Sequence, residues 1–183
     1  MSVTSQIRIR TSPRRGDRGQ SLAEFALVAP IFFLLVFSII QIGIVYGAQN
    51  ALVNGVRDAA RKAATYRVNE ASYDDATTWS AICQSIEDTL RESVGTYPAA
   101  NVSSTTLRPT ITYTWEQSLT STDYFLVAHI SADYDHTLYV PLVSFFLDSS
   151  DGSADGKLTL TADERMRIEN PALTQPASNP PAC

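Results

Sequence analysis

Residues 19–46 read G-Q-S-L-A-E-F-A-L-V-A-P-I-F-F-L-L-V-F-S-I-I-Q-I-G-I-V-Y, and this stretch decides the fold of the chain. One acid, Glu24, stands at its start, and from Phe25 to Val56 there is no Lys, Arg, Asp, Glu or His. As a helix, residues 25–46 would span roughly 33 Å, against about 30 Å for the hydrocarbon core of a bilayer. The stretch therefore predicts a transmembrane helix. Pro30 lies inside it and removes a backbone donor, which predicts a kink.

Charge differs sharply on the two sides of this helix. Residues 1–19 hold five arginines and one aspartate, a net charge of +4. Because the whole chain has a net charge of −5, residues 20–183 carry −9. A basic segment before a membrane helix stays in the cytoplasm, which places the C-terminal part on the outer side. The acidic remainder argues against nucleic acid as a partner.

Three interpretations of this N-terminal block compete. A secretory signal peptide has a shorter apolar region, of about 7–15 residues, and a small-residue cleavage site, for which V-Y-G-A is a poor match. A plain membrane anchor explains the length and the arginines but not Glu24, because an acid costs about 2.5–3.5 kcal/mol at mid-bilayer. Cleavage after Gly19 would give Gln20 a new amino group and make Glu24 the fifth residue, on the same helix face. In packed helices that acid could neutralise the terminal amine of a neighbour and set their register.

The remaining sequence predicts an α+β domain. Apolar residues recur at helical spacing as far as Tyr66 (Leu52, Val56, Ala59, Ala60, Ala63), so the long helix should continue beyond the bilayer. Ser21 and Glu24 fit a capping box at its start. A second helix is expected over residues 73–94, with Ser72 and Asp75 as its cap and one apolar stripe: Trp79, Ile82, Cys83, Ile86, Leu90 and Val94.

Alternation after Gly95 predicts antiparallel strands over residues 110–115, 124–134 and 157–167, whereas residues 136–147, which contain Pro141, fit a strand edge or a short helix. We expect the second helix and the Leu52–Ala63 part of the long helix to pack on a sheet of three or four strands. The predicted organisation is a basic leader (1–19), the long helix (20–66), an extracytoplasmic α+β domain (67–169) and a Pro-rich tail (170–183).

Two cysteines, Cys83 and Cys183, fit either of two states. An extracytoplasmic domain permits a disulfide, which would close a loop of about 100 residues. The alternative is two unpaired thiols. Their separation does not form a metal-ligand spacing.

Other polar residues give weaker indications of a site. His129 and His136, with nearby acids, could suggest a triad or a metal site, but the sequence has no G-x-S-x-G or H-E-x-x-H, so ordinary histidines are favoured. Asp148, Asp151 and Asp155 could hold calcium, although their spacing does not match an EF-hand and a solvated turn is favoured. We expect no catalytic residues, no bound metal and no cofactor.

Two motifs give the chain a family resemblance. Gly19-Gln20 followed by Glu24 and a long apolar helix resembles the leader region of type IV pilin-like proteins. More narrowly, R-G-Q-S-L-A-E-F-A-L-V-A-P-I-F-F-L-L-V-F-S-I-I-Q-I-G (18–43) with N-A-L-V-N-G-V-R-D-A-A-R (50–61) resembles the TadE family of pseudopilins, minor pilin-like proteins of the tight-adherence (Tad/Flp) pilus. L-T-A-D-E-R-M-R-I-E (160–169) is similar to the last strand of that family, whereas the acidic Asp17 departs from the leader pattern.

The resemblance implies a single-pass precursor in the bacterial inner membrane, with its N-terminus in the cytoplasm. A prepilin peptidase would cut it between Gly19 and Gln20, and it would act with other pseudopilins and the Tad assembly platform to build or prime an adhesion pilus. No small-molecule substrate is implied, and both a filament subunit and an assembly factor fit. The alternatives are an uncleaved, membrane-anchored extracytoplasmic binding domain and a membrane-tethered enzyme.

Overall fold

The structure is a computed structural model that describes residues 17–67, 75–98, 100–148, 155–168 and 179–183. Contacts divide the chain into two units, Met1–Phe37 and Ser38–Cys183. The long helix α1 (Asp17–Thr65) contributes to both units, and all the other elements belong to the second.

The first unit contains the N-terminal part of α1. The helix begins at Asp17, so Ser21 already lies within it and the predicted capping box is wrong. Large apolar side chains in this part, such as Phe25, Leu27 and Ile31, are exposed. Within the described residues, one helix segment, Gly19–Thr65, is long and apolar enough to cross a membrane. It runs through Pro30 as a single helix, and the kink there stays a prediction.

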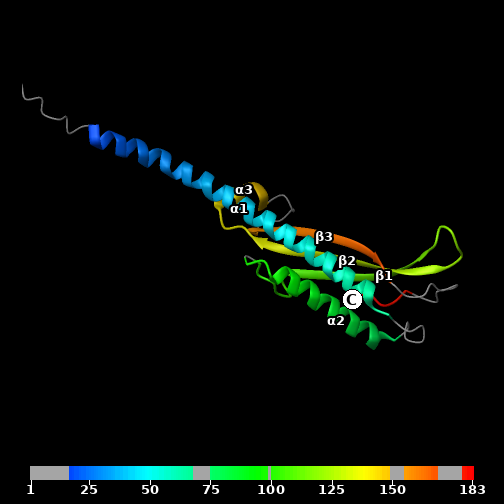
Figure 1. Ribbon diagram of the computed structural model, residues 1–183. Coiled ribbons are helices and arrows are strands. Elements are labelled where there is room, and N and C mark those ends of the chain that lie inside the picture. The colour runs from blue at the N-terminus through cyan, green and yellow to red at the C-terminus, as the bar shows by residue number, and fades with distance from the viewer. Residues whose placement is uncertain (1–16, 68–74, 99, 149–154, 169–178) are drawn as a thin grey trace, which may run out of the picture. The chain divides into compact units, whose positions relative to one another are not determined.

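A three-stranded antiparallel sheet forms the centre of the second unit (Figure 1). Its strands are β1 (Leu107–Gln117), β2 (Tyr124–Thr137) and β3 (Lys157–Arg167), in the order β1-β2-β3. Ile111 of β1 pairs with Ile130 of β2, and Ala132 of β2 pairs with Ala162 of β3. Each predicted strand is present, and β1 and β2 are longer than their alternating cores because flanking residues also join the ladder.

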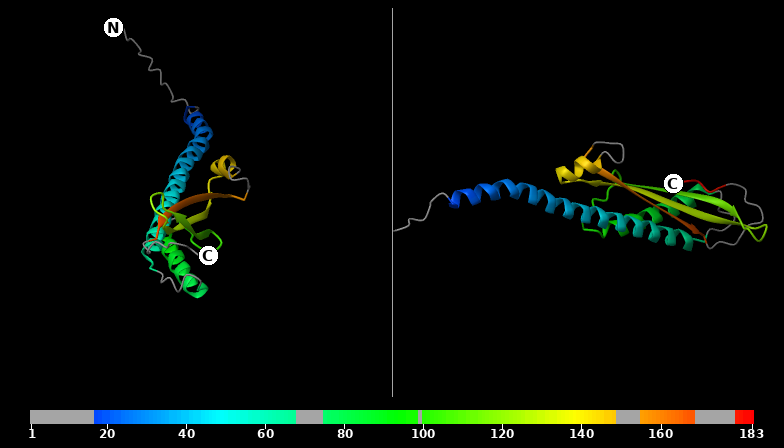
Figure 2. Two further views of the ribbon diagram at one scale, coloured as in Figure 1. Left: turned by 90° about the vertical axis from the view of Figure 1, so that its right-hand side faces the viewer. Right: turned by 90° about the horizontal axis from the view of Figure 1, so that it is seen from above.

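Two helices cover one face of this sheet: α2 (Ala76–Gly95) and the C-terminal part of α1 (Figure 2). The stripe predicted for the second helix is buried at all its positions, and so are the five apolar residues predicted on the long helix. They pack against alternate residues of the strands, among them Ile111, Leu126 and Ile130. This shared core confirms the expected α+β class.

The start of α2 differs from the sequence prediction. The helix begins at Ala76, whereas residues 72–74 lie outside the described residues. Asp75 is its N-cap, and its carboxylate accepts hydrogen bonds from the Thr77 backbone N–H and from the hydroxyls of Thr77 and Thr78. These bonds lower the pKa of Asp75 to about 2, because they stabilise the ionised form.

Residues 136–147 combine the two predicted alternatives. Strand β2 continues to Thr137, and a short helix, α3 (Pro141–Leu147), follows. Pro141 occupies the first turn of α3, where a missing backbone N–H costs no intrahelical hydrogen bond.

Both outer strands of the sheet have neighbours along their edges. The backbone N–H of Cys183 donates to the Ile111 carbonyl, and the Trp115 N–H donates to the Asn179 side chain, so residues 179–183 follow the edge of β1. On β3, the Thr161 carbonyl accepts a hydrogen bond of 2.9 Å from Gln49 of α1.

Candidate functional site

The predicted cleavage residues lie together in the first turns of α1. The side-chain amide of Gln20 donates to the Glu24 carboxylate over 3.1 Å, and both side chains are exposed. The contact follows from the helix, because residues four apart lie on one face. Among the described residues, no atom lies within 4 Å of a Cβ placed on Gly19.

This arrangement has a direct chemical consequence for a cut chain. If Gln20 were the first residue, its α-amino group would begin the helix one turn from the Glu24 carboxylate. An acid near the N-terminus of a helix also interacts favourably with the helix dipole, with an effect that falls off beyond the first turn. Both effects make an acid at this position more favourable than an acid at mid-bilayer.

Gln41 is a polar residue within the apolar run, and its contacts give it a structural role. Its side chain is buried, and its Oε1 accepts a hydrogen bond of 3.1 Å from the backbone N–H of Tyr139, in the connection between β2 and α3. The amide thus holds this connection against α1 in the second unit. Gln41 was not among the predicted site residues, although an amide within an apolar run was the available indication.

Two glycines of α1 allow close contact with α2 and the turn after it. A Cβ on Gly55 would lie 2.7 Å from Cγ2 of Val94, and one on Gly47 would lie 2.6 Å from the Tyr97 hydroxyl oxygen. The Tyr97 hydroxyl donates to the Ile44 carbonyl over 3.0 Å. Gly55 belongs to the quoted 50–61 motif, so this part of the motif has a packing role that the sequence alone did not show.

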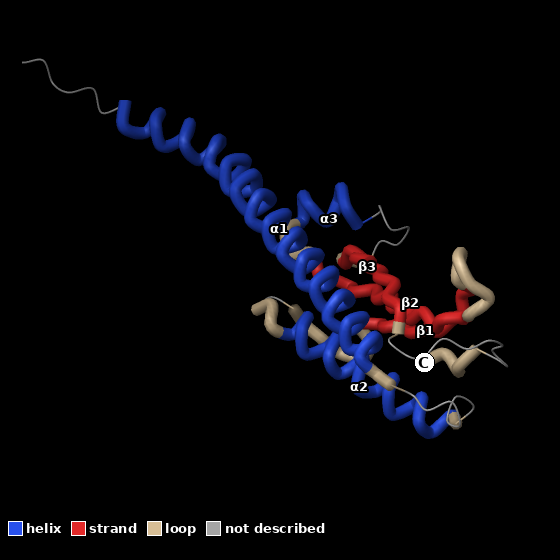
Figure 3. The backbone as a smooth tube through the Cα atoms, turned by 45° about the vertical axis from the view of Figure 1, so that its right-hand side comes forward, coloured by secondary structure: helices blue, strands red, loops and turns tan. Residues whose placement is uncertain are grey.

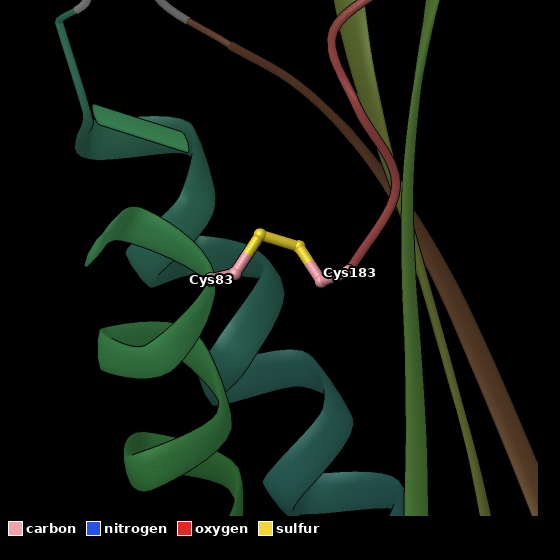
Figure 4. Close-up of a disulfide and its surroundings, with 2 residues drawn as sticks. All are labelled: Cys83 and Cys183. Atoms are coloured by element: carbon pink, nitrogen blue, oxygen red, sulfur yellow. A yellow bond between two sulfur atoms is a disulfide. The ribbon is translucent and has the colours of Figure 1, made fainter. Parts of the chain in front are cut away.

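A disulfide joins Cys83 of α2 to Cys183, with Cα atoms 5.9 Å apart (Figure 4). The Cys83 residue is buried against the core, whereas Cys183 lies on the exposed segment beside β1. The bond therefore fastens that segment to the helix that covers the sheet.

The two histidines lie on opposite faces of β2. His129 is on the face away from the helices, 3.9 Å from a carboxylate oxygen of Glu116, which also pairs with Arg165. His136 points into the helix-covered face and is buried, and neither of its ring nitrogens has a hydrogen-bond partner among the described residues. Burial lowers the pKa of His136. The structure does not bring the two histidines into one site.

The carboxylates of Asp148 and Asp155, two of the three residues considered for calcium, accept hydrogen bonds from nearby backbone N–H groups. Asp148 accepts hydrogen bonds from the backbone N–H groups of Gly156 and Lys157, and Asp155 also accepts from Lys157. Asp151 lies outside the described residues. Within the described ranges no group of three or more His, Cys, Asp or Glu side chains is placed to hold a metal ion.

Comparison with known proteins bears on the N-terminal segment. No curated protein and no solved structure gives a significant match to the chain. One family model does match, described as TadE-like protein, and the match covers residues 19–61, from the glycine of the leader motif to the end of the 50–61 motif. Over this segment the chain is similar to TadE-like proteins, which is consistent with a protein of the Tad pilus system.

Proposed function

We propose that this chain is a pseudopilin precursor that a prepilin peptidase cuts between Gly19 and Gln20. The mature protein would act with other pseudopilins and the Tad assembly platform to assemble or prime an adhesion pilus. In this role the chain contributes no catalytic residue. Its work is to insert α1 in the membrane, present the new N-terminus and carry the second unit.

The contact between Gln20 and Glu24 is the observation that carries this proposal. It places Glu24, the one acidic residue of the stretch 19–46, one helical turn from the residue that would become the new N-terminus. A plain anchor gives that acid only a contact with an exposed amide. Once an amine exists at Gln20, Glu24 has a partner within its own helix or in a helix packed beside it.

The orientation follows from charge and from the disulfide. The arginine-rich leader favours the cytoplasmic side for the N-terminus. The Cys83–Cys183 bond favours an oxidising compartment for the second unit, because cytosolic thiols are kept reduced. Together they support an inner-membrane protein with its second unit on the extracytoplasmic side.

The test is the mass of the mature N-terminus after co-expression with an active Tad-system prepilin peptidase. We expect a chain that begins at Gln20. Gly19→Val should block cleavage, because a branched side chain would obstruct a narrow peptidase subsite. Gly43→Val is the matched control, because a Cβ at either glycine meets no atom of the described residues within 4 Å.

The outcomes separate the alternatives. If the chain keeps Met1 while the co-expressed peptidase cuts another pilin, the result would support the uncleaved anchor and refute the proposal. Normal maturation of the Gly19→Val variant would refute the role given to that glycine. Glu24→Gln should still be cut but should support less pilus assembly than the wild type, as counted by electron microscopy.

A further inference from the structure

The second unit carries an exposed aromatic surface that the proposed function does not use. Tyr139, Phe145 and Phe146 are between 68% and 76% exposed, and they lie in and beside α3. Residues 138–147 contain no charged residue. We call Tyr139, Phe145 and Phe146 the aromatic surface.

This surface is continuous with the apolar side of α1. Val143, Phe146 and Leu147 of α3 and Ser38 and Ile42 of α1 together line a hollow of about 340 Å³. Figure 3 shows α3 beside α1, and the hydrogen bond from Tyr139 to Gln41 fixes this connection to the helix. Ile39, Ile40 and Ile42, on the same part of α1, are all more than half exposed.

We infer that α3 lies in the outer leaflet of the bilayer that α1 enters, with the aromatic surface inserted among the lipids. The same continuous apolar run that predicts the span, residues 25–46, includes the α1 residues that α3 contacts. A short uncharged helix with exposed aromatic side chains beside the end of a membrane span presents an apolar surface of the kind that marks membrane contact. Tyr46, also largely exposed, ends the run with the amphipathic ring common at the membrane surface.

Backbone polarity supports the same placement. In lipid an unpaired N–H is costly, and two N–H groups around the start of α3 are paired while a third is absent. The Tyr139 N–H bonds Gln41, Pro141 has none, and the Ser144 N–H bonds the Val140 carbonyl. At the other end, Asp148 caps the turn before β3 through Gly156 and Lys157, so charge begins again directly after α3.

The inference needs α1 in a membrane but does not depend on peptidase cleavage, so it can fail while the proposed function holds. Its test uses the full chain in vesicles of phosphatidylcholine and phosphatidylglycerol at about three to one, with and without brominated acyl chains. Phe146→Trp places a fluorophore on the aromatic surface. Leu119→Trp is the matched control, since Leu119 is fully exposed in the turn between β1 and β2, at the opposite end of the sheet (Figure 1).

We expect the bromolipids to quench the added fluorescence of Phe146→Trp at least twofold and to leave that of Leu119→Trp unchanged. Phe145→Trp serves as a second probe if the first variant folds poorly, and wild-type protein gives the background of Trp79 and Trp115. Equal quenching at both ends, or none at either, overturns the inference. A blue-shifted but unquenched Phe146→Trp would mean that another protein chain, not lipid, covers the surface, and it overturns the inference as well.

Discussion

Reduction of the Cys83–Cys183 bond should strongly destabilise the second unit. The two cysteines are 100 residues apart in the sequence, and for a loop of this size chain entropy gives about 4.7 kcal/mol at 25 °C. Removed native disulfides in small secreted domains typically cost about 2–5 kcal/mol, so we expect a loss within that range. With a urea dependence near 2 kcal/mol/M, the unfolding midpoint should fall by about 1–2.5 M.

The assay is urea unfolding of the detergent-solubilised full chain, followed by tryptophan fluorescence. Trp79 is a suitable reporter, because it is buried one turn before Cys83 and its ring centroid lies 4.6 Å from that of Tyr113. The Cys83→Ala/Cys183→Ala variant should match the reduced wild type and should not respond to reductant. If thiol labelling shows both cysteines free and the midpoint moves by less than about 0.3 M, the reasoning from loop closure is refuted.

Two further changes test the packing of the second unit. Gly55→Leu should lower the free energy of unfolding by about 1–3 kcal/mol, because the new side chain meets Val94, whereas Gly43→Leu meets nothing nearby; equal urea midpoints for the two variants would contradict the close approach of α1 and α2. His136→Phe should flatten the pH dependence of stability: burial lowers the pKa of His136 below its ordinary value of about 6.5, so the folded state binds fewer protons than the unfolded one and stability falls as the pH drops below about 6.5. Urea midpoints at pH 7.5 and 5.5 measure this, and a wild-type difference that persists unchanged in the variant would show that another group is responsible.

Much of the fold was predictable because its elements bury one face each. The stripe from Trp79 to Val94 has helical spacing, and Ile111, Tyr113 and Ile130 stand on strands with alternating burial, so periodicity alone found these residues. The helix starts were less predictable. Ala76 begins α2 at a position that no apolar pattern marks, and Ser21, which offered a plausible cap, lies inside α1.

The candidate site was predictable only where its residues are close in sequence. Gly19, Gln20 and Glu24 are within one or two helical turns, so helix geometry alone relates them. The contacts of Gln41 with Tyr139 and of Gly55 with Val94 join residues far apart in the chain. A single sequence holds no information on such pairs until the sheet and helices are placed, and for that reason the roles of Gln41 and Gly55 became visible only in the structure.

The neighbours along the two sheet edges have a consequence for crowding in a membrane. An open edge strand offers unpaired backbone groups to which another chain can add a strand, and from there aggregation can start. Here Gln49 bonds β3 on one side, while Asn179 and Cys183 bond β1 on the other. A strand from another copy could therefore add to β1 only after displacing residues 179–183, which the Cys83–Cys183 bond holds in place.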